Sequence, residues 1–195
     1  MRAYKSLPSR KLSHGVDLVR PADKFGPRVT LESPAPMVMT DFARIEPAGI
    51  RLHATMDMAN QTMIRLGVRL LFVLDAHDHL AGLITATDIL GEKPMRLVQE
   101  RGLRHSEVQV EDLMTPVEAL EALEYDEVSH ATVGHVVATL KAAGRQHTLV
   151  VQHDADGGVL IRGIFSVSQI SRQLGAAIQT SAAASTFSEL VNQLG

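Results

Sequence analysis

One short stretch occurs twice in this chain, first as Gly82-Leu83-Ile84-Thr85-Ala86-Thr87-Asp88-Ile89 and again as Gly163-Ile164-Phe165-Ser166-Val167-Ser168-Gln169-Ile170. Both copies have a glycine, two apolar residues, hydroxyl side chains three and five positions after the glycine, and a closing isoleucine. Only the first copy has a carboxylate, because Gln169 stands in the place of Asp88. We interpret the two copies as equivalent parts of a duplicated supersecondary unit.

The repetition extends upstream of these stretches. His53-Ala54-Thr55 recurs as His130-Ala131-Thr132, and Gly67 recurs as Gly144, each at a spacing of 77 residues (130 − 53). The stretches themselves are 81 residues apart (163 − 82). The extra residues of the second copy fall in a polar stretch between apolar runs, where a hairpin can lengthen at little entropic cost.

Composition bounds the class of protein. With 195 residues, 45% hydrophobic and 21% charged, the chain can bury a core as one compact domain or two small lobes. No run approaches the roughly 18 apolar residues of a membrane span, and the basic start lacks an apolar stretch behind it. We therefore expect a protein without a membrane span, located in the cytoplasm.

The chain has no cysteine, which excludes disulfides, thiolate nucleophiles and cysteine-based zinc sites. A net charge of -3 with 4% aromatic residues provides neither a basic footprint nor stacking platforms, so we do not expect nucleic acid as the main partner. The overall composition does not exclude a local basic cleft.

Each unit is predicted to contain a helix with matching signals. Thr55 and Thr132 stand where N-caps belong, and Gly67 and Gly144 stand where C-cap glycines belong. The apolar stripes have the same spacing in both helices: Met56, Ala59, Met63 and Leu66 in the first, and Val133, Val136, Leu140 and Ala143 in the second.

Strands are predicted on both sides of polar turns. Val68–Leu74 and Thr148–Val151 are apolar runs, and each is followed by a turn and a second strand that enters the repeated stretch. Short helices then begin near Thr87 and Ser168. Each unit therefore reads as β-α-β-β-α, with an upstream strand candidate at Met37–Thr40 that is matched by Val110–Pro116.

These patterns divide the chain into five segments. We predict an extended N-terminal arm (1–36), a first repeat (37–92), a charged connector with a helical turn or two (93–107), a second repeat (108–175) and a C-terminal helical tail (176–195).

The repeated stretch, lying after a β-hairpin with Met-Thr upstream, resembles the CBS domain, here as a tandem pair over about residues 37–175. The resemblance implies an α/β (α+β) fold in which two β-α-β-β-α repeats pack sheet to sheet about a pseudo-twofold axis. It also implies two clefts that commonly bind adenine nucleotides or adenosyl compounds, here AMP, ADP, ATP or S-adenosylmethionine as a regulatory ligand, with no cofactor required.

Carried over by position, the resemblance implies that Asp88 accepts hydrogen bonds from ribose hydroxyls and that Thr85 and Thr87 face the phosphates or sugar. Backbone groups of Gly82-Leu83-Ile84 would border the adenine. The residue chemistry agrees, because a carboxylate accepts two hydroxyl donors and threonine hydroxyls can donate to phosphate.

In the second copy, Ser166 and Ser168 fit the same pattern, but Gln169 offers only a neutral amide, so we expect a weaker or altered second site. Candidates for phosphate contact are Arg145, His147 and Arg172 in the second unit and Arg69 in the first.

Structural alternatives stand beside these roles. Asp88 is also a typical acid of a first helical turn, and the hydroxyls of both copies can cap helices. His77-Asp78-His79 and His153–Asp156 are typical of turns, and we expect no metal site. The methionines of the first unit fit core filling better than a binding surface.

No nucleophile with a base, metal cage or spaced carboxylate pair is apparent, so we do not expect an enzyme. Our hypothesis is a stand-alone regulatory module that forms a homodimer, binds an adenosyl ligand between its repeats and signals to an unknown regulated protein. The alternative is a constitutive dimerisation or adaptor module whose clefts are filled by side chains. Phe187, Leu190 and Val191 of the tail could cover a dimer edge or dock a partner.

Overall fold

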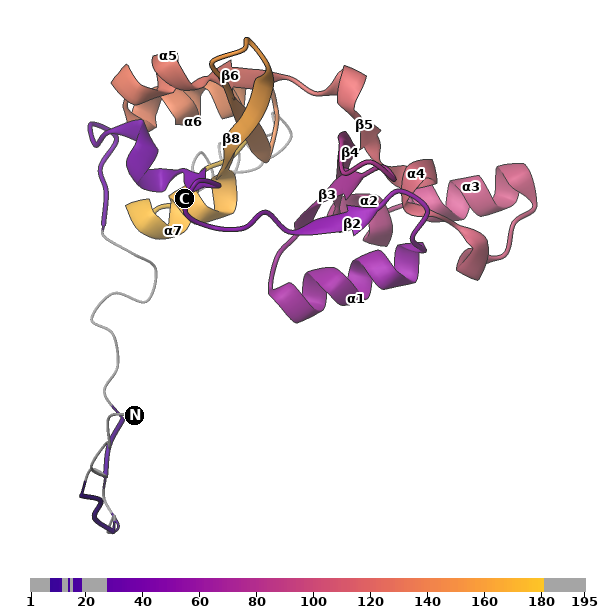
Figure 1. The fold of residues 1–195 in the computed structure, drawn as a ribbon, viewed down its shortest axis with the longest axis horizontal. Coiled ribbons are helices and arrows are strands. Elements are labelled where there is room, and N and C mark those ends of the chain that lie inside the picture. The colour runs from indigo at the N-terminus through magenta and orange to yellow at the C-terminus, as the bar shows by residue number, and fades with distance from the viewer. Residues whose placement is uncertain (1–7, 12–13, 15, 19–27, 181–195) are drawn as a thin grey trace, which may run out of the picture.

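The computed structural model describes residues 8–11, 14, 16–18 and 28–180 (Figure 1). The helices in chain order are η1 (Ala35–Val38), α1 (Met56–Leu66), α2 (Ala86–Leu90), α3 (Lys93–Arg101), η2 (His105–Glu107), α4 (Val110–Leu113), η3 (Val117–Ala119), α5 (Tyr125–His130), α6 (Val133–Ala142) and α7 (Val167–Leu174). The strands are β1 (Thr40–Asp41), β2 (Gly49–Arg51), β3 (Leu70–Leu74), β4 (Leu80–Thr85), β5 (Thr115–Pro116), β6 (Ala122–Glu124), β7 (His147–His153) and β8 (Val159–Ser166).

Two four-stranded sheets have the same topology. One has the order β2-β3-β4-β5 and the other the order β6-β7-β8-β1. In each, a central antiparallel hairpin has a parallel strand on one side and a short antiparallel edge strand on the other. The predicted mixed α/β fold with two β-α-β-β-α units is confirmed.

The edge strands are exchanged between the units. β1 pairs with β8, which places Thr40 opposite Ile164, and β5 pairs with β4, which places Leu83 opposite Thr115. In Figure 1, β5 lies beside β4, although it follows the connector toward the second unit. Each sheet is thus completed by the segment that precedes the other unit.

The exchange explains the glycine that opens both repeated stretches. A Cβ added at Gly163 would lie 2.6 Å from the carbonyl oxygen of Thr40, and one added at Gly82 would collide with the carbonyl oxygen of Thr115. No side chain fits where the exchanged strand approaches this closely. These glycines therefore admit the edge strand.

The segment before β1 differs from its prediction. Met37–Thr40 was expected as a strand, but Ala35–Val38 forms a 3-10 helix and only Thr40–Asp41 is extended. Prolines at positions 34 and 36 explain this, because they lack the N–H that a strand ladder needs. The chain before η1 packs against the second unit, where Val133 and Gly134 donate their N–H groups to the carbonyls of residues 33 and 31 at 2.9 and 2.8 Å.

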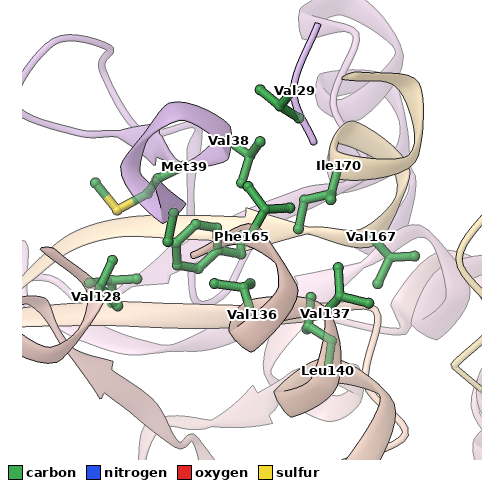
Figure 2. Packing of buried hydrophobic residues seen from close by; sticks show 13 residues of the cluster. Val29, Val38, Met39, Val128, Val136, Val137, Leu140, Phe165, Val167 and Ile170 are labelled. Carbon is green, nitrogen blue, oxygen red and sulfur yellow. The ribbon is translucent and has the colours of Figure 1, made fainter. Parts of the chain in front are cut away.

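The second unit builds its core partly from this segment. Figure 2 shows Val29, Val38 and Met39 gathered around Phe165 and Ile170, all of them buried. The first unit builds its core in the same way with residues that follow the connector and precede the second unit. Its exchanged contributors are Val108, Val110 and Leu113, all fully buried.

A third apolar cluster joins the two sheets. Phe72 and Leu83 of one sheet are buried with Leu149 and Ile164 of the other. Phe42 closes the cluster with its ring edge-on to Phe72 at a centroid distance of 5.2 Å. The predicted sheet-to-sheet packing of the two units is therefore confirmed.

The predicted helix ends are also confirmed. The Thr55 hydroxyl accepts a hydrogen bond from the Met58 N–H at 3.2 Å, and Gly67 ends α1 in the left-handed region with φ 67°. Thr132 precedes α6, and Gly144 follows it with φ 61°. Among the described residues, no helix has the length and apolar character to cross a membrane. Residues 181–195, where most of the helical tail was predicted, lie outside the described residues.

Candidate functional site

A cleft of about 740 Å³ lies between the two units, and both copies of the repeated stretch open onto it. Its walls come from the start of β3, the end of β4 with α2, the β5–η3 segment, the start of β7 and the end of β8 with α7. The lining residues that matter for the site are Arg69, Leu83, Thr85, Thr87, Asp88, Thr115, Glu121, Arg145, His147, Thr148, Ser166 and Ser168.

Asp88 lines this cleft and also closes the start of α2. Its Oδ2 accepts from the N–H of Thr85 at 2.9 Å and from the Thr85 hydroxyl at 2.6 Å. Its Oδ1 accepts from Lys93 Nζ at 3.0 Å. A carboxylate has about four acceptor positions, so one position on Oδ1 remains for a further donor. Asp88 therefore has both predicted features: it caps the start of α2 and it lines the cleft.

The two threonines of the first copy differ. Thr85 is engaged with Asp88, whose N–H it also accepts at 3.3 Å. Thr87 is exposed on the cleft wall, and its hydroxyl makes no hydrogen bond to another described residue. Thr87 is thus the hydroxyl of the first copy with free donor capacity.

The second copy presents hydroxyls without a carboxylate. The Ser166 and Ser168 hydroxyls lie 2.9 Å apart on the opposite wall of the cleft. Gln169, predicted as a ligand-binding residue, lies outside the lining, because its Oε1 accepts from the hydroxyl of Thr40 at 3.0 Å. Gln169, which replaces Asp88 in the second copy, is therefore hydrogen-bonded to the exchanged strand β1.

The fold places some of the other predicted site residues in the cleft and others outside it. Leu83, Arg145 and His147 line the cleft, as does Arg69. Gly82 does not, because its open face meets the exchanged strand β5. Arg172 lies outside the lining, with its Nε donating to the Ser168 carbonyl at 3.1 Å.

The basic side chains of the cleft differ in their partners and in their protonation. Arg145 Nη1 lies 2.8 Å from Glu121 Oε2, whereas Arg69 forms no hydrogen bond or ion pair with another described residue. Burial lowers the pKa of His147 below its ordinary value, and the nearby charge of Arg69 lowers this pKa further. His147 is accordingly neutral at pH 7.

Several lining residues were not predicted from the sequence. Thr115 belongs to the Met-Thr pair that matches Met39-Thr40, so the repeat contained a signal for it. Glu121 and Thr148 carried no such signal, because their place in the cleft depends on how the units pack. Within the described residues, no group of three or more histidine or acidic side chains gathers in an arrangement suited to a metal ion.

Comparisons with known proteins agree with this architecture. Residues 38–94 match the family model described as "CBS domain". No curated protein matches the sequence.

One solved structure with a TM-score above 0.5 shares this fold, and others are similar at lower scores. An uncharacterized conserved protein from Pyrococcus horikoshii is similar with a TM-score of 0.53 and 21% identity, covering 78% of this chain and 100% of that one. CBSX2 from Arabidopsis thaliana, solved in complex with AMP, has a TM-score of 0.49 and 20% identity, covering 72% of this chain and 93% of that one. A CBS domain protein of unknown function from Thermoplasma acidophilum has a TM-score of 0.48 and 21% identity, covering 80% and 77%.

Proposed function

We propose that this chain is a tandem CBS-domain protein and a regulatory module, which binds an adenine nucleotide or adenosyl compound in its central cleft and signals to a partner protein. The observation that supports this most is the convergence of both repeated stretches on one cleft. The second half of the proposal, signalling to a separate protein, rests on the regulatory role that the family resemblance implies.

The cleft suits such a ligand chemically. Its volume falls within the range of about 300–1,000 Å³ that is usual for small-molecule sites. Asp88 keeps an acceptor position for a ribose hydroxyl, Thr87 offers a free hydroxyl, and Arg69 offers a guanidinium that can hold a phosphate with two parallel hydrogen bonds. A polar ligand with a sugar and an anionic group fits this set.

The adaptor alternative fits less well. It expects side chains to fill the cleft, but the cleft is open between the units. A contact surface for a second copy nevertheless has support, because Met58, Ile64 and Leu66 of α1 are exposed, as are Leu90 and Met95. We therefore keep the homodimer as part of the proposal. We also propose a location in the cytoplasm, and the absence of cysteines is consistent with that reducing compartment.

Calorimetric titration with AMP, ADP, ATP and S-adenosylmethionine tests the proposal. We expect wild type to bind at least one of them and Asp88→Asn to bind about tenfold more weakly, because a neutral amide replaces a charged acceptor. The matched control is Asp112→Asn. Asp112 also accepts from a backbone N–H at a helix start and pairs with a cation, Arg101, at 2.7 Å, but it lies outside the cleft.

The outcomes separate the hypotheses. Equal loss of affinity in both variants would show that Asp88 acts only through the stability of the fold. If none of the four compounds binds wild type, the adaptor alternative is correct. Chromatography of the titrated samples would reveal turnover of the nucleotide and so contradict a non-catalytic role.

A further inference from the structure

We propose that the cleft selects ligands with a single phosphate group, because Glu121 occupies Arg145 and leaves Arg69 as the available cation. This inference rests on the proposed function and assigns a specificity role to Glu121. It concerns the number of phosphate groups, which neither the repeated stretch nor the fold determines.

The charges that line the cleft are nearly balanced. The lining includes two guanidinium groups, Arg69 and Arg145, and two carboxylates, Asp88 and Glu121, so their formal sum is zero (+2 − 2). Asp88 is paired with Lys93, whose Nζ also donates to the carbonyl of Leu113 at 2.6 Å. Lys93 is therefore held by two acceptors and does not line the cleft.

Arg145 is occupied by Glu121. The ion pair joins the segment after η3 to the segment just before β7, and both of its members line the cleft. His147 is a poorer cation than Arg145, because it is half-buried beside Arg69 and both effects lower its pKa below the ordinary value. Among the described lining residues, Arg69 is then the cation without a carboxylate partner.

One guanidinium matches one phosphate group. A phosphate monoester carries a charge of about −1.5 to −2 at pH 7, and arginine binds it with two parallel hydrogen bonds. Each further phosphate group adds negative charge that needs a second cation. In this cleft that group would compete with Glu121 for Arg145 and would lie close to the Glu121 carboxylate, which repels it.

The test compares AMP, ADP and ATP by calorimetric titration in the absence of divalent cations, using wild type, Glu121→Gln and Glu118→Gln. Glu118 is the matched control, because it is an exposed glutamate three residues away that does not line the cleft. We expect wild type to bind AMP about tenfold more tightly than ATP. Glu121→Gln should tighten ATP binding about tenfold and change AMP binding by less than about twofold, while Glu118→Gln changes neither.

A second pair of variants identifies the cations. Arg69→Gln should weaken AMP binding at least about tenfold, and Arg145→Gln added to Glu121→Gln should abolish the gained ATP affinity. The inference is overturned if wild type binds ATP as tightly as AMP, or if Glu121→Gln tightens both equally. In either case the proposed function stands, whereas absence of binding for all three nucleotides overturns both.

Discussion

The carboxylate of Asp88 has partners before any ligand arrives. It caps its own helix through Thr85 and pairs with Lys93, yet it still faces the cleft. A Thr-x-x-Asp pattern at a helix start is typical both of a capping box and of the predicted ribose anchor. The sequence therefore predicted the position of Asp88 but could not separate two roles that the structure makes compatible.

Gln169 shows the limit of inference from single residues. Its neutral amide was predicted to weaken a second site, but its hydrogen bond to Thr40 joins residues 129 positions apart. A partner at that separation depends on the exchanged strand and leaves no local pattern. The same holds for Glu121 and Arg145, whose pairing depends on the approach of a connecting segment to β7.

His147 is expected to make the folded protein sensitive to mild acid. Its pKa is lowered in the fold, chiefly by burial and also by Arg69, whereas the unfolded chain keeps a pKa near 6.5. Well above pH 6.5 both states are neutral at this residue, and it has no effect on stability. Below pH 6.5 the unfolded state binds the proton first, so stability falls until the pH reaches the folded pKa.

Urea unfolding at pH 7.5 and pH 5.5 measures this effect. Wild type should lose more unfolding free energy between the two pH values than His147→Gln, which lacks the titrating group. The other histidines contribute equally to both proteins. An identical loss in the two proteins would show that His147 is not desolvated in the folded state.

At the scale of elements, local chemistry determined what was predictable. The helices α1 and α6 begin after Thr55 and Thr132, as the cap residues and apolar stripes predicted. The edge strands β1 and β5 have only two residues each and are defined by distant partners. Their exchange was therefore not apparent from the sequence. The repeated glycines Gly82 and Gly163 are the trace of it, because only glycine leaves room for the exchanged strand.

Gly82→Ala should test this steric account. The added Cβ would collide with the Thr115 carbonyl oxygen, which belongs to the backbone and cannot rotate away, so we expect a loss of about 1–3 kcal/mol of unfolding free energy. The control is Gly49→Ala, where the nearest atom is a Leu74 side-chain carbon at 3.3 Å. Chemical denaturation should show little change for this control, and comparable losses in both variants would contradict the account.

At the scale of the whole molecule, the exchange means that a segment stabilises the unit that is remote from it in sequence, and not the unit that follows it. Val38 lies before the first unit but is fully buried in the core of the second, whereas Leu113 lies before the second unit and is fully buried in the core of the first. Each unit thus depends on a segment that is remote from it in sequence.

Hydrogen exchange on two substituted proteins can reveal this crossed dependence. Val38→Ala should cost about 2 kcal/mol and lower amide protection mainly in β7 and β8, and Leu113→Ala should cost about 2–5 kcal/mol and lower protection mainly in β3 and β4. The two variants are controls for each other. Loss of protection in the unit that follows each residue in sequence would contradict the exchange.

The crossed edge strands also impose an order of events while the chain is being synthesised. All strands of the first sheet have been synthesised once Pro116 has been added, but Asp41 finds its partner Gly163 only 122 residues after itself (163 − 41). At about 5–20 residues per second, that delay is on the order of ten seconds. During this interval Val38 and Met39 have no core to enter, so the nascent protein carries an apolar segment past the ribosome well before its fold can receive it.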